Sequence, residues 1–88
     1  MTYKIEWAAS AARELRQLDK PVARRIAVAV TALSHDPRPR GAKVLIGQPS
    51  GVMRIRVGDY RVVYVIEDAH VLITVVRVAH RRGVYRRL

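Results

Sequence analysis

The last twelve residues, RVAHRRGVYRRL from Arg77 to Leu88, concentrate side chains that can hold a phosphate and move a proton. They include five arginines, one histidine and one tyrosine, and no acidic residue follows Asp68. Arginine holds phosphate through paired hydrogen bonds. A tyrosine among arginines offers a ring on which a base can stack and a hydroxyl for proton transfer. For Tyr85 the alternative is a ring that packs on the end of a sheet.

Further arginines follow the alternation of the predicted strands, in which side chains two residues apart point the same way. Met53, Ile55 and Val57 form the apolar phase of one strand, so its arginines take the opposite face. The simplest register places all the strand arginines on the face that the helices leave uncovered: Arg54, Arg56, Arg61, Arg77 and Arg81. Five like charges repel one another unless an anion offsets them. The pattern therefore predicts a phosphate site, although exposed strand faces also tolerate arginine.

The whole chain carries a large excess of positive charge. It has 17 Lys and Arg against 7 Asp and Glu, a net charge of +10. Such an excess favours a polyanionic partner, and nucleic acid is the commonest. A solvated basic surface and a membrane surface are the alternatives. Because the excess is concentrated toward one end, we expect nucleic acid and no membrane contact.

Length and composition predict a single soluble domain over residues 1–88. The chain is 50% hydrophobic and contains no cysteine, which excludes disulfides and thiolate metal sites. Its three scattered histidines make a poor metal site, so we expect neither a metal nor another cofactor. The N-terminus lacks the apolar run of a signal peptide, and we expect a cytoplasmic protein.

The hydrophobic periodicity predicts an α+β fold with the order β-α-α-β-β-β. Residues 2–7 alternate as a strand, residues 8–18 and 21–34 have helical periodicity, and three more strands follow at 52–57, 60–66 and 71–79. The helical hairpin should cover one face of a twisted, mainly antiparallel sheet. Gly58-Asp59 suits a type II′ turn. Residues 35–51 are predicted to be a long loop, with 44–46 anchored onto the core.

Two stretches, RIRVGDYRVVY (Arg54–Tyr64) and VAHRRGVYR (Val78–Arg86), resemble the RelE family of bacterial toxins from type II toxin–antitoxin pairs. The resemblance spans essentially the whole chain. It implies a microbial ribonuclease-like fold. It also implies ribosome-dependent cleavage of mRNA in the A site, by attack of a ribose 2′-OH on the adjacent phosphate, and hence inhibition of translation.

The same resemblance implies the partners of the protein. These are the ribosome, its mRNA and a cognate RelB-like antitoxin, usually acidic, that neutralises the toxin. Operator DNA would be contacted only through the complex of toxin and antitoxin.

The resemblance also assigns roles to residues. Arg61, Arg81 and Tyr85 match the family's catalytic positions, and Arg54 and Arg56 match its basic pair. Arg77 and Arg82 would extend the phosphate-binding patch. Well-studied members carry lysines at the basic pair, and an arginine cannot serve as a base at its pKa above 12. His80 and Tyr85 remain as proton carriers, but strict alternation directs His80 toward the helices and favours a structural role.

Two other functions fit the same features. A ParE-like inhibitor of DNA gyrase would share the fold and the charge without cleaving RNA. An inert RNA-binding module would keep the basic face alone. The joint presence of Arg61, Arg81 and Tyr85 favours the ribonuclease.

Overall fold

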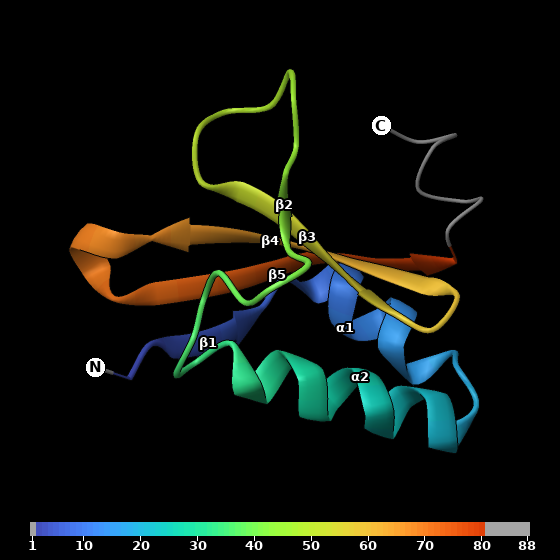
Figure 1. Ribbon diagram of the computed structural model, residues 1–88. Helices are drawn as coiled ribbons and strands as arrows, with labels where there is room; N and C mark the ends of the chain where they lie inside the picture. Colours follow the sequence, from blue (N-terminus) through green and yellow to red (C-terminus); the bar gives the residue numbers. More distant parts are fainter. Residues whose placement is uncertain (1, 81–88) are drawn as a thin grey trace.

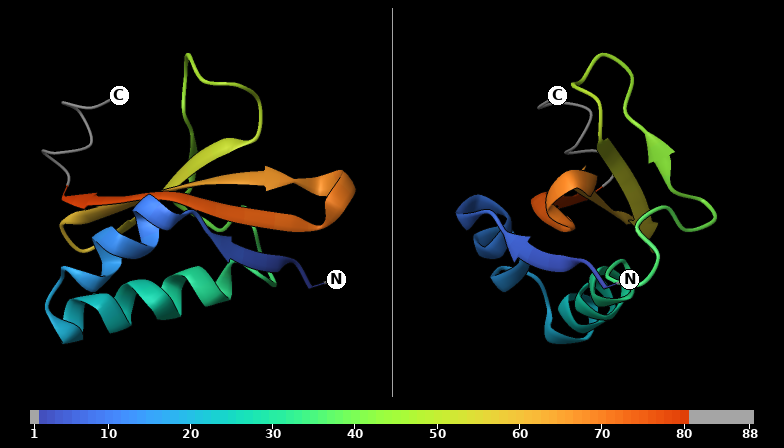
Figure 2. Two further views of the ribbon diagram at one scale, coloured as in Figure 1. Left: turned by 180° about the vertical axis from the view of Figure 1, so that it is seen from behind. Right: turned by 90° about the vertical axis from the view of Figure 1, so that its left-hand side faces the viewer.

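A helical hairpin lies against one face of a five-stranded sheet (Figures 1 and 2). The computed structural model describes residues 2–80. The elements in chain order are β1 (Lys4–Trp7), α1 (Ala9–Arg16), α2 (Lys20–Ala32), β2 (Lys43–Val44), β3 (Val52–Val57), β4 (Tyr60–Glu67), the 3-10 helix η1 (Asp68–His70) and β5 (Leu72–His80). The strand order is β1-β5-β4-β3-β2, in which β1 runs parallel to β5 and the other neighbours are antiparallel. The predicted fold class and helical hairpin are confirmed.

The two helices bury the apolar sides that their sequences predict. Pro21 lies in the first turn of α2, where its missing N–H is not needed. Ile26, Val30 and Leu33 follow at helical spacing and are at most 1% exposed. In α1 the fully buried residue is Ala11, whose small side chain lets the helix approach the sheet closely.

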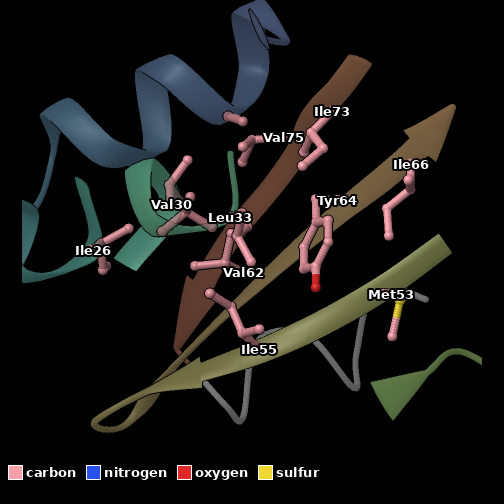
Figure 3. Packing of buried hydrophobic residues seen from close by; sticks show 12 residues of the cluster. Ile26, Val30, Leu33, Met53, Ile55, Val62, Tyr64, Ile66, Ile73 and Val75 are labelled. Carbon is pink, nitrogen blue, oxygen red and sulfur yellow. The ribbon is translucent and has the colours of Figure 1, made fainter. Parts of the chain in front are cut away.

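Tyr64 on β4 lies near the centre of the core, surrounded by residues from α2 and the neighbouring strands (Figure 3). Its side chain is fully buried, and its hydroxyl donates a 2.8 Å hydrogen bond to the carbonyl oxygen of Pro37. Burial raises the pKa of Tyr64 to about 12, so the hydroxyl stays protonated at neutral pH. This bond holds the loop that follows α2 against the sheet.

The prediction that residues 44–46 anchor onto the core is wrong. Lys43 and Val44 form the short edge strand β2, which pairs with Arg54 and Met53. The side chains of Val44 and Ile46 are 66% and 99% exposed. Beyond β2 the chain rises on the side of the sheet away from the helices (Figures 1 and 2), so its apolar side chains do not reach the core.

Glycine is required where this loop returns to the sheet. Gly51 has φ +91°, and a Cβ atom there would lie 2.7 Å from the carbonyl oxygen of Ile66. The Ile66 N–H donates to the carbonyl oxygen of Gly51 at 2.8 Å, so the two backbones are in direct contact.

The β3–β4 turn has the predicted geometry. Gly58 has φ 60°. Among the non-glycine residues between 2 and 80, only Val71 has a positive φ, so the φ of Asp59 is negative. This combination fits a type II′ turn and excludes type I′, which needs two positive φ values. In the described part of the chain, neither helix is long and apolar enough to cross a membrane.

Candidate nucleic-acid interface

The register of three strands brings four arginines onto the face of the sheet opposite the helices. Residues directly opposite each other on neighbouring antiparallel strands project to the same side. One row runs Arg56, Arg61, Ala79 across β3, β4 and β5, and the next runs Arg54, Val63, Arg77. The predicted common face is confirmed for Arg54, Arg56, Arg61 and Arg77. Arg81, Arg82 and Tyr85 lie outside the described residues.

A β-bulge in β5 makes this arrangement possible. Val63 pairs with Arg77 whereas Tyr64 pairs with Val75, which leaves Val76 as an extra residue in β5. Ile73 and Val75 belong to the core before the bulge, and Val78 belongs to it after the bulge. Without the extra residue, alternation from Val75 would direct Arg77 into the core. Regular alternation along this strand, as expected from the sequence, does not include the bulge.

Lys43 extends the arginine rows, and this position was not predicted from the sequence. It lies directly opposite Arg54 in β2 and therefore projects to the same face. Residues 43 and 44 had been assigned to a loop, because a strand of two residues is too short to show an alternation.

The centre of the arginine face is buried, which corrects the expectation of an uncovered face. Arg61 is 7% exposed and Val63 is 3% exposed. Both lie on β4, the central strand of the five. Arg56 is exposed and Arg54 is partly buried. Any anion bound at the centre would therefore interact with Arg61 through less screening than at the surface.

Arg54 has an unmet hydrogen-bonding requirement. Its Nη1 atom is buried and has no hydrogen-bond partner among residues 2–80. Within the same residues, no carboxylate lies within 4.0 Å of Arg54 or Arg56. Buried polar atoms almost always have partners, and a phosphate oxygen would supply one here.

Arg77 differs because its charge is already paired. Its Nε donates to Oε2 of Glu14 at 3.1 Å, and the side chains of the two residues are 20% and 29% exposed. Glu14 Oε1 also accepts the backbone N–H of Val78 at 2.8 Å. A role of Arg77 in phosphate binding stays a prediction, and a phosphate would have to compete with this carboxylate.

His80 lies on the other face, as the alternation predicted. It pairs with Tyr60, and the two rings meet edge-to-face with centroids 5.5 Å apart and planes at 84°. Tyr60 packs against the hydrophobic core. The position of His80 favours a structural role, and its role as a proton carrier stays a prediction.

A pocket of about 450 Å³ opens beside the arginine face, between α2, the following loop and the edge of β3. β2 pairs with β3 only at Met53 and Arg54, so the edge of β3 beyond Arg54 borders this pocket. Most of the lining is apolar, with three charged residues; the lining residues are Ala29, Ala32, Leu33, Asp36, Pro39, Arg40, Gly41, Ile55 and Arg56. Between residues 2 and 80 no cluster of three His, Cys, Asp or Glu side chains could hold a metal ion.

Comparison with known proteins places this chain in one class of protein. The family model described as the ParE toxin of the type II toxin–antitoxin system parDE matches residues 5–85. Toxin RelG of Mycobacterium tuberculosis is 34% identical over 88 residues, covering 99% of this chain and 100% of RelG. Toxin RelE of the same organism is 35% identical over 85 residues, covering 96% of this chain and 87% of that toxin.

A solved structure agrees with these matches. The toxin–antitoxin complex RelBE2 of M. tuberculosis contains a chain with a TM-score of 0.81 and 29% identity, covering 92% of this chain and 100% of that one. The protein is therefore a toxin of a type II toxin–antitoxin system. It belongs to the RelE family within the RelE/ParE superfamily, as the sequence predicted.

Proposed function

We propose that this toxin is a ribosome-dependent endoribonuclease that cleaves mRNA in the A site and so inhibits translation. The observation that carries the proposal is the arginine face, in which Arg54, beside Arg56 and Arg61, has a buried nitrogen with no hydrogen-bond partner among residues 2–80. A backbone phosphate would supply an acceptor for the Arg54 nitrogen and an anion for Arg56, neither of which has a carboxylate partner among residues 2–80. Action on ribosomes would place the protein in the cytoplasm.

The reaction is an internal transfer of the phosphate. The ribose 2′-oxygen forms a bond to phosphorus, the bond from phosphorus to the 5′-oxygen breaks, and a 5′-OH product leaves. Arg61 and Arg56 hold the phosphate oxygens and stabilise the charge that grows on them in the transition state. Arg54 completes the phosphate contacts, with Arg82 and Lys43 at the margins. Arg81 stabilises the negative charge on the leaving 5′-oxygen, and water supplies the proton that makes it a 5′-OH.

The proton steps explain why the ribosome would be needed. Arg54 and Arg56 cannot accept a proton, and His80 lies on the opposite face. Tyr85 is left to stack on the base and to take the proton of the 2′-OH. An active site with so weak a base depends on another body to hold the RNA in a reactive geometry.

The partner in the cell would be a RelB-like antitoxin, because the related RelBE2 toxin was solved as a complex with its antitoxin. An acidic, flexible chain fits the basic surface in two ways. Its apolar side chains can fill the pocket beside α2, and its carboxylates can pair with Arg40 and Arg56 at the rim. Operator DNA would then be bound only through the complex.

Mapping mRNA 5′ ends after induction in a host cell tests the enzymatic proposal. In-frame cuts at codons, lost with Arg61→Met, are the expected result. Intact mRNA together with a DNA-damage response would indicate gyrase inhibition. This is the second candidate function, because the matching family model is described as a ParE toxin. If neither response appears, the protein is an inert binding module.

The antitoxin proposal has a separate test. We expect a small acidic open reading frame beside the gene, whose product relieves toxicity and slows or shifts hydrogen exchange in residues 81–88. Salt should weaken the charged part of the contact and spare the apolar part. Failure of the neighbouring product to relieve toxicity would contradict the proposal.

A further inference from the structure

We infer that Glu14 is a positioning residue that fixes the bulge in β5 and thereby sets which face the end of β5 presents to the substrate. The inference extends the proposed ribonuclease function. It concerns a residue on α1, on the far side of β5 from the arginines of β3.

Strand β1 covers the edge of β5 along only part of its length. β1 pairs with β5 only from Leu72 to Val75, and the Ala8 N–H then donates to the carbonyl oxygen of Val75 at 2.8 Å. Beyond this bond the chain turns into α1 (Figures 1 and 2). From Val76 onward, no other strand formed by residues 2–80 covers this edge of β5.

Glu14 takes the place of the missing strand. Its Oε1 accepts the Val78 N–H at 2.8 Å, as a strand carbonyl would, and its Oε2 accepts Arg77 Nε at 3.1 Å. One carboxylate thus holds the backbone of one residue and the side chain of the residue before it. Consecutive residues in a strand point to opposite sides, so these two bonds together define the phase of the strand.

The two bonds to Glu14 hold β5 in the phase that it adopts after the bulge. In the observed register Arg61 is opposite Ala79, and Val63 is opposite Arg77. If Val76 were paired instead of bulged, continuing the register of Tyr64 with Val75 would place Val78 opposite Arg61. Arg77 would then face the core opposite Val62. Such a slip would move every side chain from Arg77 to His80 to the other face.

Glu14 therefore acts on the reaction through β5, without touching the substrate. Its carboxylate pairs with the charge of Arg77 and accepts the N–H of Val78, the two residues that follow the bulge. Bulges beside active sites commonly serve to re-aim a side chain, and here the device that holds the bulge lies on a helix. A role limited to joining α1 to the sheet is the competing explanation, and it predicts lower stability with an unchanged strand phase.

The first experiment compares Glu14→Gln and Glu14→Leu in the full-length toxin. Glutamine keeps an oxygen for the Val78 N–H, whereas leucine keeps only the bulk. Cross-strand nuclear Overhauser effects report the register: contact of Arg61 with Ala79 marks the bulged phase, and contact with Val78 marks the slipped phase. We expect the bulged phase in Glu14→Gln and its loss or mixing in Glu14→Leu. An unchanged bulged phase in folded Glu14→Leu would overturn the inference.

Kinetics on programmed ribosomes provide the functional measurement. For Glu14→Leu we expect a fall of about 10²-fold in the maximal cleavage rate, because a misplacement of about 1 Å has that cost, with KM within about 3-fold of the parent. Glu14→Gln should restore most of the rate. Glu6→Gln is the matched control, since Glu6 pairs with Lys4 on the exposed surface. A full rate per folded molecule in Glu14→Leu would also contradict the inference.

A replacement variant and the register measurement distinguish the ways in which these experiments could fail. If Glu14→Leu does not fold, Glu14→Asp replaces it, because the shorter side chain keeps the charge and withdraws it from the Val78 N–H. The same loss of phase is expected, and a retained phase refutes the inference. If the parent toxin cleaves no mRNA, the proposed function fails while the register measurement still decides the role of Glu14.

Discussion

Arg54 and Arg77 lie on either side of the same residue, Val63, in one row across the sheet, yet their electrostatic surroundings are opposite. Arg77 has a carboxylate within 3.1 Å, supplied by Glu14 of α1. Arg54 has a buried Nη1 without a hydrogen-bond partner among residues 2–80. Within residues 2–80, the protein thus supplies a carboxylate to one of these arginines and none to the other.

This difference indicates separate uses for the same residue type. An arginine paired with a carboxylate contributes to the fold, because removing it leaves the carboxylate without its counter-charge. An uncompensated arginine costs stability through desolvation and repulsion, and a bound anion would reverse that cost. The comparison predicts that substitutions at the two positions will separate stability from RNA binding.

The largest effect on the cleavage rate is expected for Tyr85, the residue proposed to carry the proton. If arginines supply only charge, the proton must pass through another group. Tyr85→Phe should then lower the cleavage rate by about 10²–10⁴-fold, the usual contribution of acid–base catalysis. If Tyr85 acts by stacking, Phe keeps most activity and Ala little. Full activity of both variants in the ribosome assay would remove Tyr85 from the mechanism.

Arg61 should give the next largest effect. It is the most buried of the described arginines on this face, so its charge acts where screening is weak. We expect Arg61→Met to lower the cleavage rate by about 10²–10³-fold, the cost of losing one preorganised charge donor. Arg61→Lys, which keeps the charge but loses the paired donors, should lie between Met and the parent. Equal rates for all three would exclude a phosphate contact at this position.

Much of the fold was predictable because its elements follow clear periods. The stripe Ile26, Val30, Leu33 and the alternation of 52–57 both depend on local spacing, and both were confirmed. The shared face of Arg54, Arg56 and Arg61 followed from the same alternation, whereas Arg77 reaches that face only through the bulge in β5. The short strand β2 was missed because two residues show no period, and Val44 and Ile46 were placed in the core on composition alone.

Features that depend on tertiary contacts could not be predicted. The bulge at Val76 arises from pairing with β4, and nothing in a run of β-branched residues marks which one is extra. The Glu14–Arg77 pair joins residues 63 positions apart, so no local spacing marks it. The burial of Arg61 also depends on strand order, which alternation alone does not define.

The pair Arg54 and Arg77 provides the direct test of the comparison. Arg77→Met should lower the free energy of unfolding by about 1–2 kcal/mol, since a charged hydrogen bond is lost at a partly exposed site. Arg54→Met should change it by less than about 0.5 kcal/mol or raise it, because an uncompensated charge is removed. Chemical denaturation measures both values.

Binding of a short single-stranded RNA should show the reverse order. Each phosphate contact contributes about 0.7 to the salt dependence of log K for single strands. Arg54→Met should reduce that slope by about this amount, and Arg77→Met should leave it unchanged. A reduced slope for Arg77→Met with unchanged stability would show that Arg77 leaves Glu14 to bind RNA, and the comparison would fail.

The smallest effect is expected at the opposite end of the sheet, where the charges are compensated at the surface. Arg38 pairs with Asp68 at 2.9 Å, and the Tyr3 hydroxyl donates to the same carboxylate at 2.6 Å. The hydrogen bonds from Arg38 and Tyr3 lower the pKa of Asp68 below its ordinary 3.8, and the bond to Asp68 raises the pKa of Tyr3 above 10.0. Asp68 therefore adds stability that is present above about pH 4 and is lost as the pH falls through its folded pKa. Tyr3 adds stability that is present below about pH 10 and is lost as the pH rises through its folded pKa.

Asp68→Asn should lower the Tm slightly at neutral pH. The difference from the parent should shrink at both extremes of pH, and thermal unfolding from pH 3 to 11 measures it. Because the side chains of Arg38 and Asp68 are 51% and 57% exposed, the change should be smaller than that of Arg77→Met. A larger one would mean that surface pairing at this end stabilises the fold more than the half-buried pair at Glu14.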